Sequence, residues 1–159
     1  MLTTTEKHDL IAAIRDLPAQ LEALVAGLTD AQLTTHFLAG EWTVAQNVHH
    51  VADSHMNAYI RTKLLLTKDN PTVIAYDQDV WAELADVHQT SIRESLDLIR
   101  GLHARWVALF ESLTDAQFAM RGMHPENGVI TVEALLRTYA GHGAAHLDQI
   151  TRTLAAQVG

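Results

Sequence analysis

Histidines are the residues with the greatest chemical potential in this sequence. The chain of 159 residues has ten of them and no cysteine, so any metal ion would be held by histidine, aspartate or glutamate side chains. His142 and His146 are four residues apart, a separation at which two imidazoles on one helix face can bind the same ion. A third ligand must then come from another part of the fold.

The position of His50 relative to its expected helix start matches that of the histidine pair. His50 lies seven residues after Thr43, whereas the pair lies eleven and fifteen residues after Thr131. All three offsets are close to whole helical turns. In a bundle of two similar helical hairpins the three imidazoles could therefore converge, which makes them a candidate metal site.

Two stripes of polar side chains accompany these histidines. One comprises Gln46, His50, Asp53 and Asn57, and the other comprises Thr138, His142, His146, Gln149 and Thr153. Such stripes are either a solvent-exposed helix face or a site inside the bundle. Glutamate, lysine and arginine are scarce in both, although an exposed face would normally contain them. This composition favours an internal site, with an exposed face as the alternative.

A metal ion held by three neutral imidazoles keeps a fourth position for water or substrate, as in catalytic zinc sites. Such an ion lowers the pKa of bound water or of a bound thiol, so that either becomes a nucleophile near pH 7. Asp53, Gln46 and Gln149 are then candidates to orient the imidazole rings. The alternative for these three residues is ordinary polarity on a helix surface.

Composition narrows the class of protein. With 11 basic and 19 acidic residues the formal net charge is −8, and no cluster of lysine and arginine is present, so nucleic acid is not an expected partner. The longest apolar runs are far shorter than the roughly 18 residues of a membrane span, and no signal peptide is evident. The expectation is a single domain over residues 1–159, located in the cytoplasm and acting on a small molecule.

Apolar residues recur at three- and four-residue steps, which predicts a mostly helical protein. The predicted long helices span residues 5–27, 43–67, 91–112 and 131–156. Thr3 and Glu6 have the spacing of a capping box at the first of them. Strand signals are nearly absent, and the long connection 71–90 holds one predicted helical turn, near 79–84. The predicted fold class is all-α, a four-helix bundle with a long crossover between the second and third helices.

An internal repeat supports the division into two hairpins. Residues 23–33 (ALVAGLTDAQL) match residues 108–118 (ALFESLTDAQF) at seven of eleven positions. Each copy ends a long helix and contains a Thr-Asp-Ala-Gln capping box for a short turn. The repeat is explained either by a pseudo-twofold bundle or by the frequency of such caps.

The chain also resembles a known family. Segment 42–61, WTVAQNVHHVADSHMNAYIR, resembles the first metal-ligand helix of the DinB-like superfamily, and specifically of its YfiT-like branch. The similarity continues in order through the segments PTVIAYD (71–77), WAEL (81–84), HPENG (124–128) and YAGHGAAHL (139–147). The resemblance therefore covers nearly the whole chain.

The resemblance implies a four-helix bundle in up-down-down-up order, with a divalent metal, zinc or nickel, held by three histidines at one end. In the family the first ligand follows a tryptophan by eight residues and precedes a Leu/Val-Ala pair, which selects His50; the helical pair selects His142 and His146. His49 is the adjacent competitor, because neighbouring residues point about 100° apart on a helix and only one of them can face the metal. Ala145 stands where relatives often have a further histidine.

For function, the resemblance implies a metal-dependent enzyme. YfiT-like proteins are described as metal-dependent hydrolases and are similar to bacillithiol S-transferases, while more distant members use mycothiol or isomerise maleylpyruvate with a thiol. A metal-activated thiol needs no protein cysteine, in keeping with a chain that has none. Transfer of a low-molecular-weight thiol is favoured. Hydrolysis by metal-bound water is the first alternative, and a non-catalytic metal-binding bundle is the second. Relatives also dimerise, which leaves a homodimer open.

Three further residues have weaker patterns. Arg61 could bind a carboxylate of a thiol cosubstrate, or form an ion pair with an acidic residue of another helix. Tyr76 lies in the long crossover, where it either contacts a substrate or anchors the loop by packing. His55 is five residues past His50 and so about 500° around the helix, which favours a hydrogen-bonded or surface role over metal ligation.

Overall fold

Threonine and serine caps mark the starts of the long helices. In the computed structural model, which describes residues 1–158, these helices are α1 (Thr4–Val25), α3 (Val44–Thr67), α6 (Ile92–Glu111) and α8 (Val132–Ala155), the last followed by a 3-10 turn, η1 (Ala156–Val158). Their N-caps are Thr3, Thr43, Ser91 and Thr131, and each side chain accepts a hydrogen bond from a backbone N–H of the first turn. The predicted boundaries are confirmed to within two residues. None of the described helices has the length and apolar character needed to cross a membrane.

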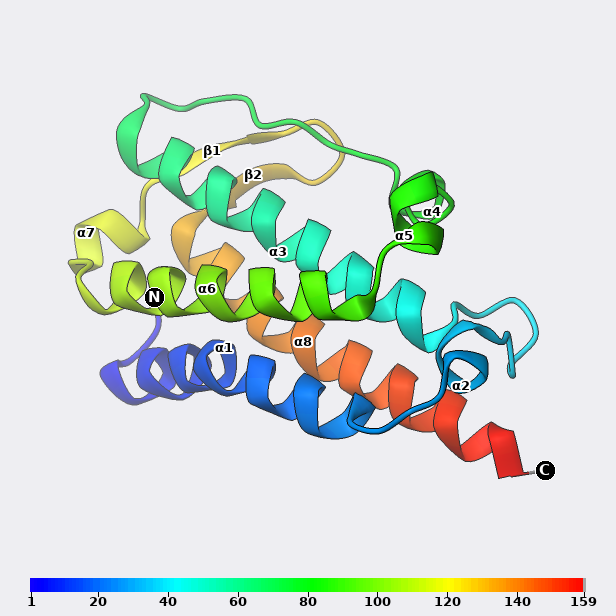
Figure 1. Cartoon of the computed structure of the whole chain (residues 1–159). Coiled ribbons are helices and arrows are strands. Elements are labelled where there is room, and N and C mark those ends of the chain that lie inside the picture. Colours follow the sequence, from blue (N-terminus) through cyan, green and yellow to red (C-terminus); the bar gives the residue numbers. More distant parts are fainter. Residues whose placement is uncertain (159) are drawn as a thin grey trace.

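The four long helices pack in up-down-down-up order. Figure 1 shows α1 and α8 running in one direction and α3 and α6 in the other. Both α1 and α3 pack against α6 and α8, so α1 and α3 lie on one diagonal of the bundle. This order requires the chain to return along the bundle between α3 and α6, and the crossover of residues 68–91 does so. The predicted fold class is confirmed.

The crossover contains two short helices where the sequence predicts one turn. They are α4 (Gln78–Trp81) and α5 (Ala85–Gln89). The side-chain amide of Gln46, at the start of α3, donates to the carbonyl oxygen of Ala82 at 3.2 Å and to the carboxylate of Glu83 at 2.8 Å. These two bonds hold the crossover against the N-terminal end of α3.

A small antiparallel hairpin is the other difference from the prediction. Its strands, β1 (Arg121–His124) and β2 (Gly128–Thr131), lie between α7 and α8, with His124 paired to Gly128 at the turn. Gly128 has φ +70°, the left-handed conformation that closes a short hairpin loop and favours glycine. The Asn127-Gly128 dipeptide is the sequence signal for this turn.

The internal repeat forms two equivalent corners of the bundle. Its copies contain α2 (Asp30–Thr34) and α7 (Asp115–Phe118), each opened by a capping box of a threonine and a glutamine three residues later. One corner precedes α3 and the other precedes α8. The two helices that carry the predicted metal ligands thus begin after equivalent corners.

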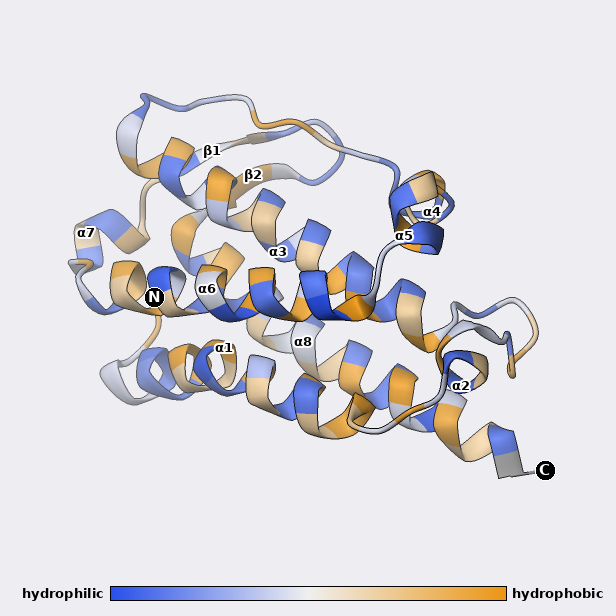
Figure 2. Ribbon diagram, in the orientation of Figure 1, coloured by the Kyte–Doolittle hydropathy of each residue, from blue (hydrophilic) through white to orange (hydrophobic). Residues whose placement is uncertain are grey.

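A polar layer divides the apolar core into two clusters. Figure 2 shows apolar and polar residues alternating along each long helix, as expected for amphipathic helices. One cluster includes Ile14, Trp106 and Leu136, and the other includes Leu21, Ile99 and Ile150, all of them fully buried. Each such side chain contributes about 1.5–3 kcal/mol to folding. Along three helices a histidine lies between residues of the two clusters: His55 on α3, His103 on α6 and His142 on α8.

Candidate metal centre

The three predicted ligands come together where α3 packs against α8. The Nε2 of His142 lies 3.2 Å from the Nε2 of His50 and 3.2 Å from the Nε2 of His146. One ring nitrogen from each residue lies within 4.8 Å of the other two. His50 and His146 are buried and His142 is half-buried, so the cluster lies inside the bundle, as the scarcity of charged residues in the two stripes predicts.

A chain of buried histidines determines which nitrogen of His142 carries the proton. The Nδ1 of His103 lies 2.6 Å from the carbonyl oxygen of Ile14, which can only accept, so this Nδ1 donates. Burial lowers the pKa of His103 and, further, that of His55, which keeps both rings neutral. His103 therefore accepts at Nε2 from His55 at 2.9 Å, and His55 accepts at its own Nε2 from the Nδ1 of His142 at 3.1 Å. The Nε2 of His142 retains a lone pair that faces the cluster.

Asn47 determines the tautomer of His146 in the same way. Its side-chain nitrogen donates to the carbonyl oxygen of Thr43 at 2.9 Å, which leaves the amide oxygen 2.8 Å from the Nδ1 of His146. Because that oxygen can only accept, His146 carries its proton on Nδ1. Its Nε2 lone pair also faces the cluster.

This arrangement of donor atoms fits a divalent metal ion. Two lone pairs held 3.2 Å apart repel each other unless a cation lies between them. Nitrogen ligands at the usual Zn–N length of about 2.0–2.1 Å in a tetrahedron are about 3.3–3.4 Å apart, close to the observed separations. Imidazole is also a suitable ligand for zinc and nickel. His50, His142 and His146 could together hold one such ion.

Burial keeps the three rings uncharged. It lowers the pKa of His50 and of His146 to about 4. The pKa of His142 falls to about 3, because repulsion from the other two rings when charged adds to the effect of burial. A metal binds the neutral form of imidazole, so these residues are in the binding form at neutral pH.

Comparison with known proteins identifies the family. The model of the DinB superfamily matches residues 13–150 of this chain. The chain belongs to the DinB superfamily. Two relatives place it in the YfiT-like branch. One, from Geobacillus kaustophilus and named "Putative metal-dependent hydrolase", is 48% identical over 91% of this chain and 82% of its own. The other, YfiT of Bacillus subtilis, has the same description and is 42% identical over 94% of this chain and 85% of its own.

A solved structure shows that this DinB superfamily member is similar to YfiT in fold as well as in sequence. The structure of Bacillus subtilis YfiT, described as "a probable metal-dependent hydrolase with an unusual four-helix bundle topology", matches with a TM-score of 0.92 at 42% identity. The match covers 96% of this chain and 88% of YfiT.

The residues expected to orient the imidazole rings are placed differently in this DinB bundle. The side chain of Gln46 caps α3 and holds the crossover. Asp53 is half-buried, and burial raises its pKa to about 6. Gln149 lines a pocket beside His146. Within the described part of the chain none of the three has a hydrogen bond to a ring nitrogen of the cluster. Asn47 and His55, which sequence reasoning did not assign to this role, orient the rings instead.

His49 lies outside the cluster. Its Nδ1 is 2.8 Å from the hydroxyl oxygen of Ser95 on α6. The two adjacent histidines therefore face different helices, as the 100° step between neighbouring residues requires. Of the pair, the structure brings His50 to the other two rings.

Two pockets meet at His142. One, of about 340 Å³, is lined by Arg61, Tyr76, His124 and neighbouring residues, and the other, of about 320 Å³, by Trp42, Gln149, His146 and neighbouring residues. Both also include Gln78 of the crossover and His142 itself. Arg61 and Tyr76, predicted as candidate binding residues, thus share a pocket with a ring of the cluster.

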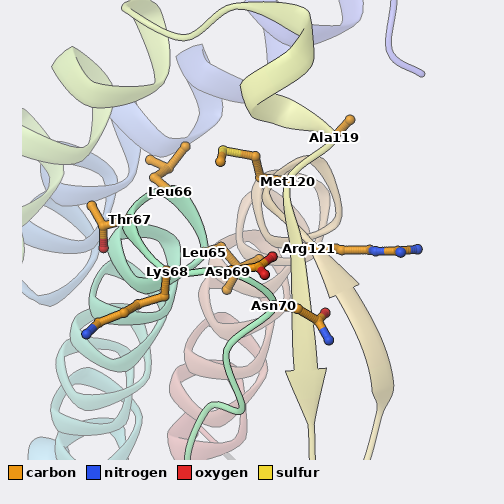
Figure 3. Close-up of a pocket in the computed structure, with 9 residues that line it drawn as sticks. All are labelled: Leu65, Leu66, Thr67, Lys68, Asp69, Asn70, Ala119, Met120 and Arg121. Carbon is orange, nitrogen blue, oxygen red and sulfur yellow. The ribbon is translucent and has the colours of Figure 1, made fainter.

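A hollow larger than either of these two pockets lies away from the histidine cluster. It has a volume of about 630 Å³ and is lined by residues 65–70 at the C-terminal end of α3 and by residues 119–121. Leu65 is fifteen residues beyond His50, about 22 Å along the helix. Figure 3 shows Lys68 and Arg121 extending in opposite directions, so these two charged side chains do not converge. The histidine cluster with its two pockets is therefore the candidate site.

Proposed function

We propose that this protein is a metal-dependent enzyme that transfers a low-molecular-weight thiol to an electrophilic small molecule at the cluster of His50, His142 and His146. The observation that carries the proposal is that the Nε2 lone pairs of His142 and His146 face each other at 3.2 Å. Hydrogen bonds that begin at the backbone carbonyls of Ile14 and Thr43 determine both tautomers. The names of the YfiT-like relatives support metal dependence. Zinc and nickel are the proposed metals.

A divalent metal at this cluster would lower the pKa of a thiol and so supply a nucleophile that a chain without cysteine lacks. In the transfer, a carbon–sulfur bond forms while the leaving group departs from that carbon with its electron pair, and the thiol proton passes to solvent. The part of the protein is to hold the rings neutral and oriented through Asn47 and His55, and to bring the two reactants together.

The two pockets favour a reaction of two substrates. Each borders His142, so a thiol in one and an electrophile in the other would meet at the cluster. Pockets of about 300 Å³ or more are of the size that small molecules occupy. The alternative is a hydrolase, in which water takes the place of the thiol, and the second alternative is a bundle that binds metal without catalysis. A small-molecule substrate, a cytoplasmic location and a homodimer belong to the same proposal.

The first experiment is metal analysis of protein prepared without a histidine tag. We expect about one zinc or nickel ion per chain in the wild type and its loss in H50A, H142A and H146A, because each variant removes one of three ligands. H49A is the matched control: it removes a buried histidine of the same helix and is expected to retain the metal. A wild-type protein that cannot be loaded, or loading that survives in all three variants, would contradict the site.

The second experiment separates the three functions. The metal-loaded protein is incubated with an electrophilic chloroarene, with and without a thiol, and with an activated ester. Conjugation that needs both thiol and metal supports the transferase. Ester cleavage without thiol supports the hydrolase, and metal binding without either reaction supports the non-catalytic bundle.

A further inference from the structure

Arg61 is a buried arginine without a carboxylate partner. Its side chain is only 8% exposed, and its hydrogen bond is from Nη2 to the carbonyl oxygen of Ile74 at 2.6 Å. Its Nε is buried and has no acceptor. No carboxylate in the described part of the chain forms an ion pair with it. Five other arginines do have such partners: Arg15, Arg93, Arg100, Arg137 and Arg152.

A buried guanidinium without a counter-charge is unfavourable, because desolvation is not offset by an ion pair. The sequence left open an ion pair between Arg61 and an acidic residue of another helix, and no such pair occurs among the described residues. Two acidic residues, Asp77 and Glu126, line the same pocket. Asp77 instead accepts hydrogen bonds from the backbone N–H groups of Asp79 and Val80, and neither acid pairs with Arg61. Arg61 itself lines this pocket, so the pocket is a space beside the guanidinium in which a counter-charge could bind.

Two neighbours of Arg61 shape the pocket for an anion. The guanidinium lies over the ring of Tyr76, 5.9 Å from its centre, and that ring packs on Trp81 at 4.3 Å. On the hairpin, the Nδ1 of buried His124 accepts from the backbone N–H groups of Glu126 and Asn127 at 3.2 and 3.3 Å. A neutral His124 then carries its proton on Nε2, which makes this pocket-lining residue a potential hydrogen-bond donor to an anion.

We propose that Arg61, with His124 and Tyr76, binds an oxyanion group, carboxylate or phosphate, of a reactant at the histidine cluster. The inference rests on the proposed function, since the pocket shares His142 with the cluster. The guanidinium is planar and presents several N–H donors to an oxyanion. A reactant bound there would also border His142, which lines the same pocket. The substrate, or the thiol, is accordingly an anionic small molecule.

The test compares two thiols that differ in one group. Binding of 3-mercaptopropionate and of the uncharged 3-mercaptopropan-1-ol to the zinc-loaded protein is measured by isothermal titration calorimetry. We expect the wild type to bind the carboxylate about 10- to 100-fold more tightly, the usual range for a hydrogen bond to a charged group. R61Q should abolish this preference while binding of the alcohol stays unchanged, and R61K should give an intermediate value.

Two controls keep the result interpretable. R93Q removes the same charge from an exposed arginine of α6 and should leave the preference intact, which excludes an effect of net charge. Metal content and thermal unfolding show whether R61Q folds. If R61Q does not fold, H124A is the second variant, with an expected loss of about 2- to 10-fold in carboxylate binding.

The outcomes separate this inference from the proposed function. If both thiols bind equally, or if R61Q and H124A retain the preference, the oxyanion site is wrong while thiol binding stands. If neither thiol binds but acetate or inorganic phosphate binds in an Arg61-dependent manner, the oxyanion site is supported and thiol transfer is contradicted. Competition of 3-mercaptopropionate with acetate and with phosphate, in the wild type and in R61Q, distinguishes the two sources of the oxyanion.

Discussion

His103 has no spacing signal in the sequence, yet it determines the tautomer of His142, to which it is linked through the ring of His55. Its hydrogen bond to the Ile14 carbonyl sets the direction of every bond in the chain through His55 to His142. The His55 and His103 rings are also stacked, with centres 4.9 Å apart and planes within 8°. A backbone carbonyl of α1 thus determines, through His103 of α6 and His55 of α3, which ring nitrogen of His142 in α8 carries the proton.

Replacement of His103 by phenylalanine is predicted to weaken metal binding by up to about 10-fold, the low end of the effect of removing a direct hydrogen-bond partner of a ligand, because His103 acts on His142 through His55. H103F retains a ring but removes the acceptor for His55, so the proton positions of His55 and His142 are no longer determined. H103Q keeps an acceptor oxygen and should retain more of the affinity. The measurement is the dissociation constant for zinc in competition with a chromophoric chelator.

The visible spectrum of the cobalt-substituted protein provides a readout that a general loss of packing would not change in the same way. We expect the cobalt bands of H103F to shift, because the environment of His142 changes, and those of H103Q to remain close to wild type. Thermal unfolding without metal verifies that both variants fold. Equal zinc affinity and identical cobalt spectra in H103F and the wild type would show that the chain of histidines has no role at the metal.

At the scale of elements, the position of α8 depends on a close approach to α1 beside the cluster. A Cβ added at Gly143 would lie 2.6 Å from the Cδ2 of buried Leu17, whereas one added at Gly141 would meet nothing within 4 Å. The two glycines are in the same helix, and alanine gains about 0.5–1 kcal/mol in helix propensity at each. The difference in stability between G143A and G141A therefore measures the effect of the contact with Leu17 alone.

We predict that G143A is less stable than G141A by about 1–3 kcal/mol, the usual effect of overpacking a core. G141A should be slightly more stable than the wild type. Urea unfolding of the metal-free proteins, followed by circular dichroism, measures both differences. Equal midpoints for the two variants would mean that Leu17 moves without cost and that helix packing does not limit the position of α8.

The elements could be predicted where their signals are local. A threonine and the glutamine or glutamate three residues later define a helix start on their own, so the caps at Thr3 and Thr43 were sufficient to place α1 and α3. The hairpin depends on distant partners. Met123 of β1 donates to the carbonyl oxygen of Pro71 and accepts from the N–H of Val73, both in the crossover. Two strands of four residues have too little pattern to reveal such pairing.

The same distinction holds for the candidate site. His142 and His146 are recognisable from spacing because both lie on one helix, and His50 from its distance to an equivalent helix start. Asn47 and His55 act on rings of another helix, so no spacing within α3 identifies them. Their signal is burial alone: each is a polar residue that is fully buried in the apolar interior of the bundle.

At the scale of the whole molecule, the polar layer makes stability depend on pH. Burial lowers the pKa of each histidine in the layer, so the folded state of the metal-free protein binds fewer protons than the unfolded state below about pH 6.5. The free energy of unfolding rises with pH wherever the unfolded state binds more protons. The contribution of these histidines is therefore fully present above pH 6.5 and is lost as the pH falls toward the folded-state values, about 4 for His50 and His146.

We predict that the metal-free protein loses stability steadily between pH 7 and pH 5, by up to about 1.4 kcal/mol per pH unit for each buried histidine that takes up a proton on unfolding. Urea unfolding in the presence of a chelator, at half-unit pH steps, measures the slope. H49L removes one buried histidine outside the cluster. Burial also lowers the pKa of His49, against the opposing effect of Asp86 and Glu94. The slope of the free energy of unfolding against pH should therefore be smaller in H49L, by an amount that corresponds to the uptake of at most one proton. A wild-type stability that is constant over this pH range would mean that the interior histidines are hydrated in the metal-free state. The polar layer would then become buried only when the metal binds.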